Sequence, residues 1–411
     1  MNVLVVSDVD LQDGASGAER VLAAHCRGLA KRGHRVYLIA GVRGGKASAV
    51  EEVRGVEVYR YRRSLASCLR AGRLFRALSR RVPVDVMIFH QPLSALGVVF
   101  VRASRFIPKA SVFLSPWAEE YAVRLADPKG AGKLLRRTVE RLVLRTCQRI
   151  FVLSRFMAAR LALEHPRLED RAVLLPGGVD LDHFRPAESR QALKMSLGVP
   201  AGCPLLLTVR NLEPRMGLEH LLHAMAEVAP ALKDVFLLIG GAGPMENALR
   251  GLVEQLGLGR SVRCEGYIPE ERLPAYYQAA DFFILPSQAL EGFGLVAVEA
   301  LACGTPVLGT PVGAIPEILG GLQPDLLFEG STPPAIANGI LTHVERAAAD
   351  PRGYEVLRQR CRAYATARFG WAPIIEQLER ELVRLTGRPE LSRPPLSPAG
   401  RGGHGHARTG R

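Results

Sequence analysis

Two glutamates beside a glycine-containing loop are the residues of this chain best suited to chemistry. Glu291 and Glu299 are separated by seven residues, which include Gly292 and Gly294. Glycine lets a backbone approach a ligand closely, and the free amides at a helix start bind phosphate. Carboxylates on both sides of such a loop could hold the hydroxyls of a sugar and of a ribose. From this loop alone, a glycine-rich turn with two surface acids remains the alternative.

The elements around the loop are those that would position it. An apolar run of strand length, 280–285, ends at a proline, and the residues after Gly294 suit a helix. The whole stretch 286–317 resembles the Glu-x7-Glu signature of family 4, the retaining glycosyltransferases of the GT-B fold. The resemblance implies that Glu291 acts in catalysis by holding hydroxyls of the donor sugar, and that Glu299 holds the ribose. It also implies a diphosphate site made by Gly292, Phe293, Gly294 and Leu295.

A basic loop after a second expected strand would complete the diphosphate site. The segment 205–217, LLLTVRNLEPRMG, resembles the family pattern Gly-Arg-Leu-x-x-x-Lys-Gly. Asn211 and Met216 occupy the positions of the arginine and the lysine. We therefore expect the adjacent Arg210 and Arg215 to supply the charge, because guanidinium groups bind phosphate well.

The run 235–250 predicts a strand, a glycine turn and a helix. The spacing Gly241-x-Gly243-x-x-Glu246 lacks the third glycine of a dinucleotide fingerprint, which argues against an NAD-binding protein. Gly241 is instead expected on the donor side. Tyr267 is expected there too, because 263–267 resembles the segment that lies against the nucleotide base in relatives.

A glycine loop also follows the first expected strand, 2–7. The loop 14–17 reads Gly-Ala-Ser-Gly and precedes Glu19 at the start of an expected helix. It resembles the Gly-Gly-x-Glu loop of family 4, with Ser16 in place of the first glycine. The resemblance implies that Gly17 approaches the donor phosphate and the acceptor.

Candidate acceptor residues follow two other expected strands. His90 comes directly after the run 84–89, at the end where α/β sheets bind ligands, although a plain loop histidine is an equal alternative. The segment 113–121, FLSPWAEEY, resembles the family's acceptor segment, which commonly reads His-x-Pro-Trp. Leu114 replaces that histidine, and Trp117, Glu119 and Glu120 remain candidates for contacting an acceptor sugar.

The order of the motifs predicts an α/β chain of two Rossmann-like domains that face each other across a cleft. The segment 176–186 resembles the family's inter-domain segment, Pro-x-Gly-Val-Asp-x-x-x-Phe-x-Pro. A helix near the C-terminus is expected to cross back onto the first domain, and a glycine- and arginine-rich tail is expected to be disordered. The predicted ranges are an acceptor-side domain at 1–185, a nucleotide-sugar-binding domain at 186–367, the crossover helix at 368–387 and the tail at 388–411.

The overall composition narrows the class of protein. The chain has 411 residues, 48% of them hydrophobic, and no apolar run of the about 18 residues that a transmembrane helix needs. The first ten residues predict a strand and not a signal peptide. Seven scattered cysteines without a Cys-x-x-Cys pair predict reduced thiols, a cytoplasmic location and no zinc site. We expect no cofactor, no metal and metal-independent chemistry.

The net charge of +14 comes from basic patches in the first domain. Eight arginines lie within 60–81, and Lys133, Arg137, Arg141, Arg145 and Arg149 recur every four residues as a predicted helical ridge. An anionic membrane surface and a plain solvated surface are the alternatives for this charge. Nucleic acid is not expected as a partner, because no stacking motif or helix-turn-helix pattern accompanies it.

The family resemblance covers residues 1–386 and implies transfer of a sugar from a nucleotide-sugar donor with retention of configuration. The expected acceptor is a glycan or a lipid-linked glycan, in polysaccharide or glycolipid synthesis at the inner membrane face. The runner-up is a binding or scaffold protein of the same fold, motivated by Leu114, Asn211 and Met216.

Overall fold

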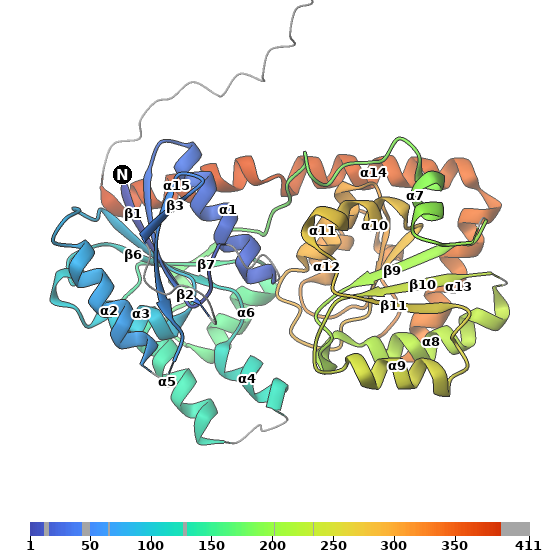
Figure 1. The fold of residues 1–411 in the computed structure, drawn as a ribbon, viewed down its shortest axis with the longest axis horizontal. Coiled ribbons are helices and arrows are strands. Elements are labelled where there is room, and N and C mark those ends of the chain that lie inside the picture. The colour runs from blue at the N-terminus through green and yellow to red at the C-terminus, as the bar shows by residue number, and fades with distance from the viewer. Residues whose placement is uncertain are drawn as a thin grey trace, which may run out of the picture.

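The computed structural model describes residues 1–11, 16–42, 50–64, 66–125, 130–200, 202–232 and 234–387. Two α/β units lie side by side, each built on a sheet of parallel strands with one antiparallel edge strand in the first sheet, and two C-terminal helices run along them (Figure 1). This confirms the predicted architecture of two Rossmann-like domains. Residues 14 and 15 of the first glycine loop and the tail 388–411 lie outside the described residues.

The first sheet has the strand order β3-β4-β2-β1-β5-β6-β7-β8, and only the edge strand β3 is antiparallel to its neighbour. Alternate residues of its strands are buried on opposite faces, as in β1, where Val3 and Val5 join one core and Leu4 and Val6 the other. A sheet covered on both faces needs such continuous apolar strands. Its strands are β1 Asn2–Ser7, β2 Arg35–Val42, β3 Val50–Val53, β4 Val56–Arg62, β5 Val86–Phe89, β6 Lys109–Phe113, β7 Arg149–Val152 and β8 Ala172–Leu174.

Helices cover both faces of this sheet. Apolar residues of α1 share one core with the C-terminal helix α15, whereas α2, α3, α5 and α6 contribute to the core of the opposite face. Ser16 caps α1 and forms a capping box with Glu19, which explains why the helix begins at Gly17. The helices of this domain are α1 Gly17–Lys31, α2 Ser67–Leu78, α3 Pro92–Val99, α4 Trp117–Leu125, α5 Ala131–Arg145 and α6 Arg155–Glu164, with short 3-10 turns η1 Arg102–Ser104 and η2 Glu169–Arg171.

The second sheet is parallel throughout and has the order β11-β10-β9-β12-β13. In Figure 1, α8, α9 and α13 lie on one side of it, and α10, α11 and α12 on the other. Its strands are β9 Leu205–Val209, β10 Phe236–Gly240, β11 Val262–Gly266, β12 Phe282–Leu285 and β13 Val307–Gly309. The helices and turns are α7 Arg190–Ser196, η3 Pro214–Met216, α8 Leu218–Ala231, α9 Glu246–Gln255, η4 Glu270–Arg272, α10 Leu273–Ala279, α11 Leu295–Ala302, α12 Ile315–Leu319, η5 Pro324–Leu326 and α13 Pro333–Ala349.

One helix, α15, carries the chain back to the first domain, as predicted. The helix α14 (Pro351–Phe369) packs on α11, and α15 (Trp371–Thr386) packs on α1 (Figure 1). The break falls at Gly370, whose backbone is extended and which pairs with Val179 of the inter-domain segment. The extended glycine therefore separates α14, which belongs to the second domain, from the crossover helix α15.

The predicted basic ridge is shorter than its four-residue repeat indicated. Arg149 lies on β7, where its guanidinium donates to Glu381 at 3.3 Å, because α5 ends at Arg145. Within the other patch, Arg60 is buried against Asp10 and Glu51 and belongs to the interior. Across the part of the chain that the structure describes, no helix is both long and apolar enough to pass through a bilayer.

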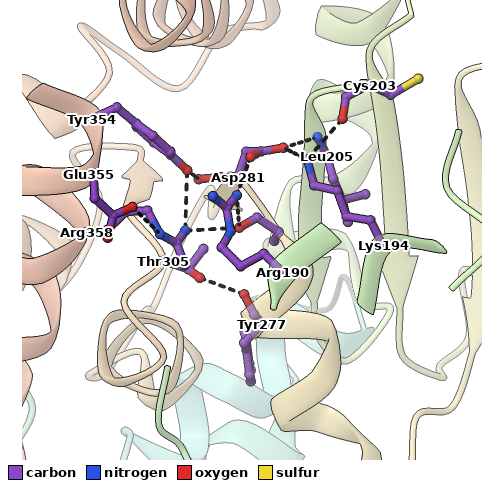
Figure 2. Close-up of polar contacts among 11 residues, drawn as sticks. Arg190, Lys194, Cys203, Leu205, Tyr277, Asp281, Thr305, Tyr354, Glu355 and Arg358 are labelled. Carbon is purple, nitrogen blue, oxygen red and sulfur yellow. Dashed lines mark hydrogen bonds and ion pairs between the residues drawn. The ribbon is translucent and has the colours of Figure 1, made fainter. Parts of the chain in front are cut away.

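A polar cluster fixes the start of β12, the strand that leads to Glu291 (Figure 2). The Asp281 carboxylate accepts from Arg190 and Lys194 of α7 and from the amide of Leu205 on β9. The hydroxyl of Tyr354 on α14 donates to the Asp281 carbonyl at 2.6 Å. One carboxylate thus ties α7, β9 and β12 together, while its backbone carbonyl holds α14.

Replacing Asp281 by alanine should lower the free energy of unfolding by about 3 kcal/mol, because two cations then lose their partner inside the fold. Chemical denaturation followed by circular dichroism would measure this change. Asp325→Ala, which removes a half-exposed partner of Arg346, is the matched control and should cost less than about 1 kcal/mol. Equal losses in the two variants would show that the cluster does not anchor the strand.

Candidate active site between the two domains

The cleft between the domains lies at the switch point of each sheet. In the first domain the chain order reverses between β1 and β5, and in the second between β9 and β12. Ligands of open α/β sheets bind where loops leave the strand ends at such points. A cavity of about 1360 Å³ occupies this place and is lined from both domains. Its volume exceeds the roughly 300–1,000 Å³ of a pocket for one drug-sized molecule, so two substrates fit.

Glu291 lies at the centre of a buried polar triad in this cleft. Its carboxylate pairs with the Arg210 guanidinium and accepts a hydrogen bond from the Ser287 hydroxyl at 2.8 Å. Arg210 also donates to that hydroxyl at 2.7 Å. Arg210 follows β9, and Ser287 and Glu291 follow β12, so neighbouring parallel strands bring the three together.

The triad keeps Glu291 ionised. Burial alone would raise the pKa of this carboxyl, but the Arg210 guanidinium and the Ser287 hydroxyl hold the pKa below its ordinary value. An ionised carboxylate accepts hydrogen bonds and donates none, so it suits the hydroxyl groups of a sugar. The structure also shows that Arg210, expected at the diphosphate, makes its main contact with Glu291.

The backbone beside Glu291 is strained. Leu290 has a φ of +51°, which a leucine rarely adopts and which costs about 1–2 kcal/mol. Two residues later, a Cβ on Gly292 would come within 2.8 Å of the Leu114 carbonyl oxygen of the other domain. The loop 290–294 is therefore held in one conformation directly before α11. Its residues Gly292, Phe293 and Gly294 line the cleft, together with Leu295, the first residue of α11.

Other predicted donor residues also line the cleft. Arg215 donates to the Leu290 carbonyl at 3.2 Å, and its Nε lies 3.5 Å from Glu213, so this arginine braces the loop before Glu291. Gly241 has a φ of +136°, and a Cβ there would lie 1.8 Å from the Arg210 carbonyl oxygen, which requires glycine. Gly17 and Tyr267 lie in the cleft wall too, and Met216 contributes an apolar surface at the position where the family pattern has a lysine.

Glu299, the predicted ribose ligand, lies beneath the cleft surface. Its side chain is 3% exposed and pairs with Arg20 of the first domain, while the Tyr277 hydroxyl donates to its other oxygen at 2.9 Å. Arg20 itself lines the cleft and covers Glu299.

The acceptor side of the cleft contains an aromatic and cationic wall. The Arg136 guanidinium of α5 lies 3.5 Å from the ring centroid of Tyr121 and 5.4 Å from that of Trp117. Trp117, Glu120 and Tyr121 share one face of α4 and line the cleft. Glu119 is on another face and pairs with Arg160, so of the two candidate acids it is Glu120 that lines the cleft.

His90 is in the cleft lining but is almost completely buried, at 3% exposure. Its ring lies edge-on to His25 at 5.3 Å, and neither ring nitrogen has a partner among the described residues. Burial and the neighbouring His25 hold the pKa of His90 well below its ordinary value. The ring is therefore neutral and can donate one hydrogen bond and accept another.

Two polar contacts join the domains near the loop 290–294. The Ser154 hydroxyl donates to the Gly292 carbonyl at 2.7 Å. The Glu317 carboxylate accepts from the first amides of α6, those of Arg155 at 2.8 Å and Phe156 at 2.7 Å. A carboxylate at a helix N-terminus is favourable, so α6 of one domain holds α12 of the other.

Glu317→Ala should weaken this contact by about 1 kcal/mol, the usual cost of losing a helix-capping side chain. Because the contact joins the domains, we expect a larger radius of gyration in X-ray scattering, together with a small drop in melting temperature. Glu329→Ala removes a charge from the exposed surface of the same domain and should change neither quantity. A radius unchanged in both variants would mean that Glu317 does not control the separation of the domains.

Several cleft residues were missed from the sequence. Helical spacing could have indicated two of them, because Tyr121 is four residues after Trp117 and Arg20 three after Gly17. Three residues outside the cleft lining, Ser287, Ser154 and Glu317, had no such signal, since their partners Arg210, Gly292 and Arg155 are far away in the chain. Among the described residues, no group of three or more His, Cys, Asp or Glu side chains is gathered as metal ligands would be. Metal independence stays a prediction.

Each of the two domains matches the model of a known protein family. The model described as Glycosyltransferase Family 4 matches residues 15–183, and the model described as Glycosyl transferases group 1 matches residues 189–368. Together they span the two sides of the cleft, including the first glycine loop and the Glu291 loop.

Individual relatives agree with the family models. The D-inositol 3-phosphate glycosyltransferase 1 of Catenulispora acidiphila is 31% identical over 303 residues, which are 72% of this chain and 71% of that protein. A GDP-mannose-dependent alpha-(1-6)-phosphatidylinositol monomannoside mannosyltransferase of Mycolicibacterium smegmatis is 32% identical over 53% of this chain and 56% of its own. Sucrose-phosphate synthase from Thermosynechococcus elongatus has the same fold, with a TM-score of 0.80 at 24% identity over 94% of this chain and 100% of its own. The chain therefore belongs to the family 4 glycosyltransferases and is an enzyme of the GT-B fold.

Proposed function

We propose that the enzyme transfers a sugar from a nucleotide-sugar donor to a glycan or lipid-linked acceptor, with retention of configuration. The observation that carries this proposal is the buried Glu291–Arg210–Ser287 triad beside the loop that starts α11. The ionised Glu291 is placed to accept hydrogen bonds from the donor sugar. The relative from Mycolicibacterium smegmatis, which uses GDP-mannose by its name, supports a donor of this class.

The departing diphosphate needs stabilisation of its growing negative charge, which is usually the largest contribution to such catalysis. The amides of Phe293, Gly294 and Leu295 at the start of α11 are suited to this, and Arg215 adds a cation in the same wall. We propose that the leaving phosphate takes the proton of the acceptor hydroxyl. In this mechanism Glu291 orients the sugar and forms no covalent bond with it.

A panel of nucleotide sugars tests this proposal. UDP-, GDP- and ADP-sugars are incubated with the protein, and the released nucleoside diphosphate is measured with and without candidate acceptors. We expect one donor class to be consumed by the wild type and much more slowly by Glu291→Gln. Nucleotide binding without consumption of any donor would favour the scaffold alternative, and the absence of both would overturn the proposal.

We further propose that the acceptor is lipid-linked and that the first domain rests on an anionic membrane surface at the cytoplasmic face. The helical layer of α2, α3 and α5 exposes several large apolar residues together with exposed arginines, a combination typical of membrane-surface helices. We call this layer, with its adjoining turn, the basic-apolar face. Its exposed apolar residues are Leu69, Phe100, Phe106, Leu134, Leu135 and Leu142.

The helix α5 links this face to the acceptor side of the cleft. Leu134 and Leu135 are 69% and 63% exposed, whereas the next residue, Arg136, turns into the cleft against Trp117. A lipid inserted beside these leucines would place its glycan near the aromatic wall. We propose polysaccharide or glycolipid synthesis at the inner membrane face as the setting; one relative acts on a phosphatidylinositol mannoside by its name.

A further inference from the structure

The starts of two helices face each other across the cleft, one from each domain. A Cβ on Gly17, the first residue of α1, would lie 3.3 Å from the Leu295 side chain at the start of α11. One turn behind these starts, Arg20 of α1 pairs with Glu299 of α11. The ion pair therefore lies directly behind the place where the diphosphate is proposed to bind.

The pair leaves Arg20 partly unsatisfied. Its Nη1 holds Glu299, but its buried Nε has no hydrogen-bond partner among the described residues. Helical side chains lean toward the helix N-terminus, so the Arg20 side chain is directed toward the start of α1. The guanidinium also lines the cleft, and it thus has both free donors and access to a bound anion.

Glu299 is not accessible while this pair exists. Arg20 covers one carboxylate oxygen and Tyr277 occupies the other, which leaves the side chain 3% exposed. The hydroxyls of a ribose could donate hydrogen bonds to this carboxylate only after Arg20 leaves. An arginine that leaves a buried carboxylate needs another anion, since an unpaired charge in this interior is costly.

We propose that Arg20 exchanges partners when the donor binds, releasing Glu299 to the ribose and pairing with the diphosphate. This inference rests on the proposed function and adds a donor-binding residue from the acceptor-side domain. The exchange keeps the charges balanced, because Arg20 passes from a carboxylate to a phosphate and Glu299 passes from a guanidinium to hydroxyl donors. A step of about one helical turn, roughly 5.4 Å, separates the two positions.

The exchange makes a prediction that a structural ion pair does not. In Arg20→Ala the carboxylate is uncovered, so binding of the free nucleoside should become about threefold to tenfold tighter. Binding of the matching nucleoside diphosphate should become roughly tenfold weaker, since a charge-assisted hydrogen bond is lost. The dissociation constant of the nucleoside divided by that of the nucleoside diphosphate should thus fall by about thirtyfold or more. Arg20→Lys should restore most of this ratio.

The experiment uses the full chain and whichever of UDP, GDP and ADP binds the wild type, together with its nucleoside. Titration calorimetry, in displacement format for the weaker ligand, gives both constants on the same protein preparation. An unfolded fraction lowers both occupancies alike and leaves the ratio unchanged. Arg32→Ala, which removes the ion pair of α1 with Glu379 away from the cleft, is the matched control and should not change the ratio.

The outcomes separate this inference from the proposed function. A ratio that is the same in the wild type and Arg20→Ala would show that Arg20 only holds the domains together, and would overturn the exchange while leaving the enzyme proposal intact. A wild type that binds none of the three nucleotides would overturn both. A lower ratio that Arg20→Lys raises again would establish Arg20 as a diphosphate ligand.

Discussion

Glu291→Gln should reduce sugar transfer by about a hundredfold or more while changing the affinity for the free nucleoside diphosphate by less than about threefold. The carboxylate orients the sugar, and a hydrogen bond to a charged group contributes about 1.5–3 kcal/mol, or roughly ten- to a hundredfold. Loss of the charge also leaves Arg210 without its ionic partner, which adds to the effect. Initial rates and calorimetric titration would measure the two quantities.

Ser287→Ala is the matched control for this prediction. It removes a hydroxyl that bridges Glu291 and Arg210 but keeps both charges, so we expect a loss of only about threefold to tenfold in turnover. If Glu291→Gln weakens nucleotide binding as strongly as it slows transfer, Glu291 would be a nucleotide ligand or a folding element. The division of roles between Glu291 and Glu299 would then be wrong.

Changing Arg137, Arg141 and Arg145 of the basic-apolar face to glutamate should abolish binding to vesicles that contain anionic lipid. Each basic residue near such a surface contributes about 1 kcal/mol, so losing three weakens binding by more than about a hundredfold. Sedimentation with vesicles of phosphatidylcholine and phosphatidylglycerol would measure the bound fraction.

The control for this charge reversal carries three arginine-to-glutamate substitutions on the other domain, at the exposed Arg250, Arg260 and Arg352. Its binding should decrease only slightly. Vesicle binding that is equal in both variants, or that persists in high salt, would show that the basic-apolar face is ordinary solvated surface. A lipid-linked acceptor would then lose its main structural support.

The sequence was informative where function depends on backbone conformation. Glycine at 292, 294 and 241 marks places where the chain approaches another backbone or adopts a positive φ, and such requirements are visible in a sequence. The apolar run before each glycine loop predicted a strand. The ends of these strands then predicted where the cleft lies. Glu291 could be predicted because it is adjacent to such a loop.

Side-chain pairing across long separations could not be predicted. Arg210 and Glu291 are 81 residues apart, and Arg20 and Glu299 are 279 apart, so no local pattern indicates either pair. Both pairs bear on the expected roles. Arg210, expected at the diphosphate, pairs with Glu291, and Arg20 covers Glu299, the predicted ribose ligand. Which of the candidate acids Glu119 and Glu120 lines the cleft could not be predicted either, because the helix start that fixes the phase of α4 was not known.

The anomeric configuration of the product is the most direct test of the account. The reaction of the wild type with its α-configured nucleotide sugar and an acceptor would be followed by NMR, in which the one-bond carbon–proton coupling at the anomeric centre distinguishes α from β products. Retaining transfer predicts an α-linked product formed at the rate of nucleoside diphosphate release, and strongly reduced in Glu291→Gln. A β-linked product, or release that is unaffected by Glu291→Gln, would contradict the proposed mechanism.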